Sequence, residues 1–336
     1  MTYEKCLNPL FLILSAFLST YAYAMPSHQL IEDLNKVLSS NSPSPWQHLP
    51  KSNLRFIVVD ASTNQGTAIG YSQAELQASG IKYEFSNNGS TLTGLKFPEI
   101  DFFTACDFIS CGENQAWNEN DRGSIAPIVT LFNSSRHPIL LISSELSGDW
   151  ATVPALMGVT EEQVLLITAL HESFHSYQNL ISLHAQSGSR PESTRCFGTN
   201  DSNVDPLVVS DMANWNAVLK TLFFKPSDFM SMLQKAVSFN ASKNDACLKT
   251  AWFLQEAVPQ YFSLGLISDA GIFSKKQIYH YYSSLWLEKP DYSSLNYGIG
   301  LVMMQSLAHL DPALTWQKNL EDGEMIDQVL QNYLVR

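Results

Sequence analysis

The sequence has few charged residues, and basic ones are the scarcer kind. Charged side chains make up 15% of the 336 residues, and 20 Lys and Arg residues stand against 32 Asp and Glu residues. The resulting formal net charge of −12 repels phosphate backbones, so we expect no nucleic-acid partner. Hydrophobic residues, at 45%, are sufficient for one large or two modest globular domains.

Three common catalytic or cofactor-binding motifs are also absent. The chain contains no Gly-x-Ser-x-Gly elbow for a nucleophilic serine, no phosphate-binding loop and no dinucleotide fingerprint. The sequence therefore shows no sign of a serine nucleophile of that type or of a nucleotide site.

Beyond the first 24 residues, no run is long and apolar enough to span a bilayer. The first 24 residues carry a positive charge, Lys5, near their start. They continue through the apolar stretch LNPLFLILSAFLS and end in the small-x-small sequence Ala22–Ala24. This order is typical of a cleaved signal peptide, and the alternative is an uncleaved anchor. We predict a soluble exported protein, periplasmic or secreted, that has no membrane span after cleavage near Met25.

Cysteine is scarce. Loss of the signal peptide removes Cys6 and leaves Cys106, Cys111, Cys196 and Cys247. An even number in an exported chain predicts two disulfides, for which three connectivities exist. Proximity favours Cys106–Cys111, which leaves Cys196–Cys247. No pair has the Cys-x-x-Cys spacing of a zinc cluster, so we do not expect these cysteines to bind metal.

The hydrophobic pattern changes near residue 150. Short β-branched or aromatic runs predict strands at 54–60, 80–86, 91–97, 125–132 and 137–143. Before them, NSPSPWQHLP (41–50) is rich in Pro and Ser and is typical of a linker. Helical spacing dominates later, at 160–184, 207–223, 227–238, 243–266, 274–288, 296–310 and 321–335. The prediction is an α+β fold, in which a sheet-containing N-terminal α/β region (25–150) precedes a mainly helical region (151–336).

One helical segment carries a pattern typical of zinc enzymes. A capping box in TEEQ (160–163) predicts its start, and LITALHESFHSYQ (166–178) continues it. His171 and His175 are four residues apart, so their imidazoles share a face at a reach suited to one Zn²⁺. Glu172 lies about 100° further round the helix. It flanks the metal without ligating it and can take a proton from the water that zinc activates. The alternative is a helix with two buried, hydrogen-bonded histidines and no metal.

A catalytic zinc ion needs a third protein ligand. His184 lies on the far side of the same helix from His171 if that helix continues. Glu256 is a better candidate, because it lies within a second apolar helical segment, where an unpaired carboxylate is costly and a metal would supply the partner. Carboxylates in or after the intervening polar loop remain alternatives: Glu192, Asp201, Asp205 and Asp211.

The two segments HESFH and FLQEAVPQY (253–261) together resemble the gluzincin metallopeptidases. These carry His-Glu-x-x-His on one helix and a glutamate on a second, often within Glu-Gly-x-Ala-x-Tyr. Glu256 and Tyr261 match the second pattern, whereas Ala257 and Pro259 depart from it. The resemblance spans about residues 160–265. It implies a zincin-like metal-binding part with Glu172 as the general base and three zinc ligands: His171, His175 and Glu256.

Several nearby residues are candidates for supporting roles. Pro259 predicts that the second helix kinks or restarts beside Glu256. Gln260 lies four residues after Glu256, on the same face, and can hold a ligand histidine in place. Candidates for stabilising an oxyanion are Tyr261, Tyr297 and His309, although core packing would also explain each of them.

The sequence thus predicts an exported zinc metallopeptidase that acts on a peptide or protein. A substrate could extend an edge strand such as PILLIS (138–143). Two alternatives remain: an exported non-catalytic binding protein with a structural metal, and a zinc hydrolase of a non-peptide amide.

Overall fold

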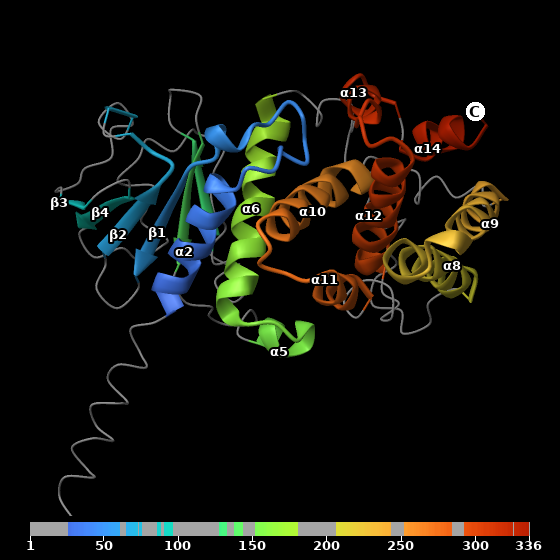
Figure 1. Cartoon of the computed structure of the whole chain (residues 1–336), viewed down its shortest axis with the longest axis horizontal. Coiled ribbons are helices and arrows are strands. Elements are labelled where there is room, and N and C mark those ends of the chain that lie inside the picture. Colours follow the sequence, from blue (N-terminus) through green and yellow to red (C-terminus); the bar gives the residue numbers. More distant parts are fainter. Residues whose placement is uncertain are drawn as a thin grey trace, which may run out of the picture.

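The computed structural model contains one mixed β-sheet beside a larger group of helices (Figure 1). It describes residues 26–60, 65–72, 74–75, 86–88, 91–96, 128–132, 138–143, 152–180, 206–242, 252–283, 292–324 and 326–335, some of them by backbone alone. Helices predominate, and the described strands all lie between residues 56 and 143. The expected order, a sheet-containing part followed by a mainly helical part, is therefore confirmed.

The sheet has the strand order β3–β4–β2–β1–β6–β5. Its described strands are β1 (Phe56–Asp60), β2 (Gln65–Ile69), β3 (Ser86–Asn88), β4 (Thr91–Lys96), β5 (Ile128–Phe132) and β6 (Pro138–Ser143). β1 pairs parallel with β6, whereas the other neighbours pair antiparallel. Four predicted strands correspond to β1, β4, β5 and β6; residues 80–85 of the fifth lie outside the described residues.

The expectation that PILLIS offers an edge strand is wrong. This segment is β6, which lies between β1 and β5, so both of its sides are already paired. Among the described strands, the edges are β3 and β5. The strongly apolar sequence of PILLIS did not identify an edge strand of the sheet, because such a run is typical of an interior strand.

The described helices and 3₁₀ turns are α2 (Pro26–Ser39), η1 (Lys51–Asn53), α5 (Val153–Met157), α6 (Glu161–Leu180), α8 (Pro206–Phe224), η4 (Pro226–Asp228), α9 (Phe229–Ser242), α10 (Trp252–Asp269), α11 (Lys275–Tyr282), α12 (Tyr292–Leu310), α13 (Trp316–Glu321) and α14 (Ile326–Val335). The seven helices predicted after residue 150 correspond to α6, α8, α9, α10, α11, α12 and α14. The short helices α5 and α13 were not expected.

Helix α6 lies between the sheet with α2 on one side and α10, α11 and α12 on the other (Figure 1). It packs against α2, β5 and β6 on one side and against α10 on the other, and α10 packs in turn against α12. Its side chains are buried on most of its circumference, as the apolar sequence predicts: Val164, Leu165, Leu166, Ile167, Ala169, Leu170 and Phe174. The histidine-bearing helix is therefore fixed from several directions.

Residues 41–50 do not behave as a linker. Trp46 is fully buried, and its ring meets Phe174 of α6 and Trp316 of α13 edge-on, at centroid distances of 5.2 and 5.8 Å. The side-chain amide of Gln317 bonds to the backbone of this segment at Pro45 and Gln47. The segment is part of the core because the Trp46 side chain packs between two buried aromatic rings, Phe174 and Trp316.

Candidate functional site

The start of α6 is fixed by the predicted capping box. The Gln163 side chain accepts a hydrogen bond from the Thr160 backbone N–H (3.0 Å), and the Thr160 hydroxyl accepts one from the Gln163 backbone N–H (3.3 Å). Glu161 and Glu162 follow in the first turn, where the helix dipole favours negative charge. Both histidines of the motif lie in the same helix, one turn apart, as predicted.

The first histidine is buried and has a defined partner on α10. His171 is 8% exposed, and its Nδ1 lies 3.1 Å from Oε1 of Gln260. An amide oxygen can only accept a hydrogen bond, so with the amide in this orientation Nδ1 carries a proton, and in the neutral ring Nε2 then carries the lone pair. This is the tautomer in which a histidine binds a metal through Nε2.

Gln260 is itself held on its other side. It is 3% exposed, and its Nε2 donates a hydrogen bond of 3.1 Å to the hydroxyl of Tyr281 on α11. α10 runs from Trp252 to Asp269 with Pro259 inside it. The helix therefore does not restart at Pro259, and the alternative of a kink beside Glu256 stays a prediction; α10 packs against α6 and α12, which helps it to continue past one lost backbone hydrogen bond.

Helix α10 also carries Glu256, one turn before Gln260. The side chains of His175, Glu256 and Tyr297 lie outside the described part of the structure, as do all the cysteines and Glu192, Asp201 and Asp205. Within the described part, no three His, Cys, Asp or Glu side chains are grouped so that they could hold a metal ion. The zinc triad and both disulfides thus stay predictions, although the helices that carry the triad pack side by side.

Of the remaining ligand alternatives, Asp211 is fully buried on α8. His184, which helix geometry disfavours as a ligand, falls outside the described residues.

Two of the oxyanion candidates make other contacts. Tyr261 is 5% exposed and meets Trp316 edge-on at 5.7 Å, while the ring of the exposed His309 lies 4.7 Å from that of Phe229. Both line a cavity of about 420 Å³ bounded by α8, α10, α11 and α12. Burial raises the pKa of Tyr261 above its usual range. The described contacts thus bring Gln260 to His171 and give Tyr261 and His309 packing partners, while the oxyanion role of these two residues stays a prediction.

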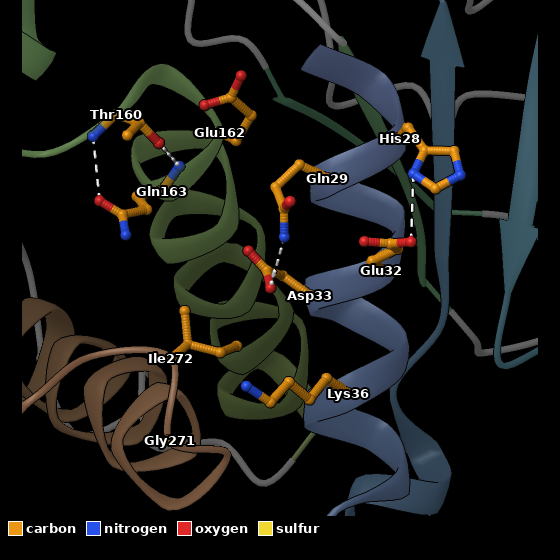
Figure 2. A pocket seen from close by; sticks show the side chains of 10 residues that line it. All are labelled: His28, Gln29, Glu32, Asp33, Lys36, Thr160, Glu162, Gln163, Gly271 and Ile272. Atoms are coloured by element: carbon orange, nitrogen blue, oxygen red, sulfur yellow. Dashed lines mark hydrogen bonds and ion pairs between the residues drawn. The ribbon is translucent and has the colours of Figure 1, made fainter. Parts of the chain in front are cut away.

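A larger pocket, of about 880 Å³, lies between α2 and the amino-terminal end of α6 (Figure 2). Thr160 and Gln163 line it, and Gln163 lies roughly 12 Å along the helix axis from His171 at 1.5 Å per residue. Its side chains are mainly acidic and polar, and among them Asp33 is buried and accepts a hydrogen bond of 3.2 Å from Gln29. Burial, followed by weaker repulsion from neighbouring carboxylates, raises the pKa of Asp33 above 3.8.

We expect Asp33→Asn to stabilise the protein near neutral pH. Because the pKa of Asp33 is raised in the folded protein, folding favours the neutral form of its carboxyl. The contribution of the neutral carboxyl to stability is fully present below pH 3.8, and it is lost as the pH rises through the folded pKa. The gain in unfolding free energy from Asn should therefore be seen at about pH 7 and vanish at acid pH, as chemical denaturation would show. Asp228→Asn, which makes the same change at an exposed carboxyl on η4, is the control. An equal gain at both pH values would contradict the burial argument.

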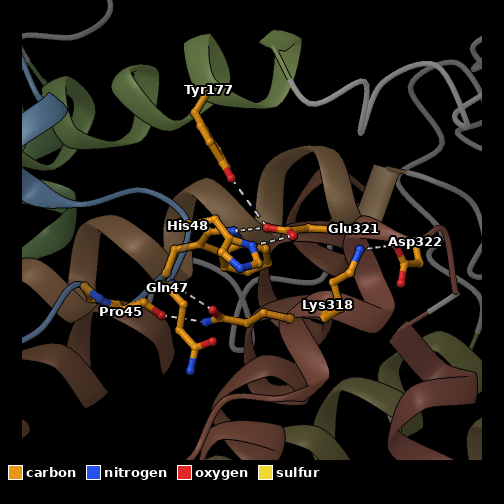
Figure 3. Close-up of polar contacts among 9 residues, drawn as sticks. Pro45, Gln47, His48, Tyr177, Lys318, Glu321 and Asp322 are labelled. Atoms are coloured by element: carbon orange, nitrogen blue, oxygen red, sulfur yellow. Dashed lines mark hydrogen bonds and ion pairs between the residues drawn. The ribbon is translucent and has the colours of Figure 1, made fainter.

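The carboxyl-terminal half of α6 is tied to α13 by a network that the sequence did not reveal (Figure 3). Glu321 accepts hydrogen bonds from the Trp46 indole (2.9 Å) and from the Tyr177 hydroxyl (3.5 Å), and it lies 2.6 Å from Nδ1 of His48. Burial, and next the neighbouring Glu321, raises the pKa of Tyr177 to about 12. In the sequence, the one feature that could have indicated this network is the presence of Trp46 and His48 within the Pro/Ser-rich residues 41–50.

Comparison of the chain with known protein families, characterised proteins and solved structures finds no match. None of the helices in the described part is long and apolar enough to cross a membrane. The interpretation of the site therefore rests on its residues and their geometry.

Proposed function

We propose that this protein is an exported zinc-dependent hydrolase of the gluzincin type that cleaves peptide bonds. The observation that carries the proposal is the contact between His171 on α6 and Gln260 on α10. It supports the proposal because the two sequence motifs lie on helices that meet at this point, 89 residues apart in the chain.

The residues present fit a zinc ion. Two imidazoles and one carboxylate are the ligands of many catalytic zinc sites, which leave a fourth position for water. The hydrogen bond from Nδ1 of His171 to an amide oxygen supports coordination through Nε2 and fixes the ring. His171, His175 and Glu256 would hold the metal. Gln260, one turn after Glu256 on α10, reaches the first of these ligands.

Zinc would polarise the scissile carbonyl and bring the pKa of a water toward about 7. Glu172 directly follows His171 on α6 and is half-buried. Its carboxylate accepts the proton of the attacking water and returns it to the departing amine. The burial around His171 limits the access of bulk water, which strengthens the electrostatic interactions within the site.

Metal analysis of the purified protein tests the proposal. We expect about one zinc per chain in the wild type and its loss in Glu256→Ala, because two imidazoles alone leave the ion without its third protein ligand. Glu162→Ala, in the first turn of α6, is the matched control and should retain the metal. A wild-type protein that takes up no zinc after dialysis against the metal would refute the proposed function. Full retention by Glu256→Ala would refute the third ligand.

A further inference from the structure

A cavity beside α10 is lined by polar groups that have no partner in the described part of the structure. It is the cavity of about 420 Å³ that Tyr261 and His309 line, and we call it the α10 cavity. Tyr261 directly follows Gln260, so it lies about 100° further round the helix than the side chain that contacts His171. Neither Gln260 nor His171 is among the described residues that line the α10 cavity. The proposed zinc site therefore does not explain this cavity.

The hydroxyl of Tyr261 is the most enclosed of these groups. Tyr261 is 5% exposed, and its ring packs edge-on against Trp316. Within the described residues its hydroxyl makes no hydrogen bond, and its oxygen is not sealed inside the protein, so it faces the open space of the cavity. A buried polar group without a partner is costly, and such a group commonly marks a place that water, an ion or a ligand fills.

Two further oxygen-bearing side chains line the cavity at the carboxyl-terminal end of α10. Ser268 is half-buried and its hydroxyl bonds to no described residue, whereas the Ser263 hydroxyl donates to the Gln260 carbonyl of the same helix at 3.0 Å. Asp269 ends the helix, where the dipole disfavours a negative charge. Its carboxylate has no hydrogen bond or ion pair with any described residue. The cavity thus carries an unpaired negative charge beside a hydroxyl group.

Lys51 is the cation that acts on Asp269, but its own bonds go elsewhere. Its ammonium group donates to the Ser40 carbonyl at 3.1 Å and also to the Ser40 hydroxyl. Asp269 remains exposed to solvent, yet burial of its carboxyl outweighs the attraction to Lys51 and raises its pKa above 3.8. A cationic group of a ligand would supply the partner that the described residues do not.

Much of the remaining wall is apolar, and the cavity suits a small molecule. Phe223 of α8, Leu264 of α10 and Ile278 of α11 line it, and its volume lies within the range of about 300–1,000 Å³ that is usual for ligand sites. Tyr261 and Asp269 lie roughly 12 Å apart along the axis of α10, at 1.5 Å per residue. A small ligand can therefore reach both only if it has polar groups at opposite ends.

We propose that the α10 cavity binds a small, elongated primary amine with an apolar body and a hydroxyl group at its far end. Its ammonium group binds Asp269 and Ser268, and its hydroxyl group bonds to Tyr261. An ammonium has only donors, which suits two oxygen-bearing groups, one of them charged. The net charge of −12 also favours a cationic ligand over an anionic one. Lys275 lines the cavity too, but it is exposed, and its long side chain can hold its charge in solvent.

Four related compounds test these features one at a time. Tyramine carries both the ammonium group and the hydroxyl, phenethylamine lacks the hydroxyl, tyrosol lacks the charge, and phloretate carries the opposite charge. We expect calorimetric titration of the whole, metal-free protein near neutral pH to show saturable binding of tyramine. Phenethylamine and tyrosol should bind more weakly, and phloretate should not bind. Because no zinc is present, the result is independent of the proposed function.

Replacement of the carboxylate tests the ammonium end. Asp269→Asn should weaken tyramine binding about 3- to 10-fold, as expected for a charge-assisted hydrogen bond at a partly exposed site, and should leave tyrosol binding unchanged. Lys275→Gln removes a cation from the same cavity and should not weaken tyramine binding. Asp228→Asn, at an exposed carboxyl on η4, should match the wild type. Wild-type tyramine affinity in Asp269→Asn, or a weaker affinity in Lys275→Gln, would contradict the proposed ammonium site.

Replacement of the enclosed hydroxyl tests the other end. Tyr261→Phe should weaken tyramine binding about 2- to 10-fold, the effect of one neutral hydrogen bond, and leave phenethylamine binding unchanged. Thermal unfolding followed by circular dichroism shows whether each variant folds. Should Tyr261→Phe not fold, the wild-type preference for tyramine over phenethylamine and the exposed Asp269→Asn variant still decide. Equal binding of all four compounds, or a wild type that does not bind tyramine, would overturn the proposal.

Discussion

Replacement of Glu172 by Gln is expected to lower peptide hydrolysis by about 10²- to 10⁴-fold while zinc stays at about one per chain. Gln has nearly the same shape as Glu but cannot accept the proton of the attacking water. The residue lies beside His171 on α6 and is half-buried, so the substitution should leave the helix and its contacts in place. Turnover of a peptide library, measured together with bound metal, checks both parts.

Glu162→Gln is the matched control for this experiment. It makes the same chemical change on the same helix, but in the first turn, ten residues or roughly 15 Å along the axis from Glu172. We expect it to retain wild-type turnover. A Glu172→Gln protein that holds zinc and still cleaves peptides at the wild-type rate would remove Glu172 from the base role.

Replacement of Trp46 by Ala is expected to lower the free energy of unfolding by about 3–5 kcal/mol, the usual range for a buried large aromatic side chain. Trp46 is fully buried between Phe174 and Trp316, and its indole N–H is bonded to Glu321. The substitution leaves a cavity between α6 and α13 and removes a donor from a carboxylate that is only 12% exposed. Chemical denaturation at fixed pH measures the loss.

Two further variants separate the contributions. Trp46→Phe keeps a ring but removes the indole N–H, so its cost should be about 1–3 kcal/mol, the range for a buried polar group that loses its partner. Val335→Ala, at a side chain that is 88% exposed, should change stability by no more than about 0.5 kcal/mol. If Trp46→Ala cost no more than Val335→Ala, residues 41–50 would be a linker after all.

Much of the helical part could be predicted because its signals are local. The capping box of Thr160 and Gln163 satisfies backbone groups only three residues apart, and the structure contains both of its hydrogen bonds. Apolar residues at helical spacing likewise predict the start of α6 and the end of α10 to within a few residues. The first part of the helix predicted at 243–266, residues 243–251, lies outside the described residues. The helical spacing of His171 and His175 belongs to the same local geometry.

Other features could not be predicted because their partners are distant in the chain. β2 contains Gly66 and Ala68, which have low strand propensity, yet it is an interior strand because β1 and β4 pair with its two sides. Gly265, within α10, looks like a weak point of a helix. A Cβ there would lie 2.6 Å from Cγ of Pro45, so the glycine allows the segment 41–50 to cross.

The sequence by itself determined the helix that carries His171 and His175, where that helix starts, and the choice of zinc chemistry as the hypothesis, because backbone hydrogen bonds and side-chain spacing act over three or four residues. Only the tertiary structure decided that Gln260 meets His171, that Tyr281 is hydrogen-bonded to Gln260, and that Trp46 is part of the core. Those pairings depend on which apolar faces pack together, and many faces of similar composition could have satisfied the same local pattern.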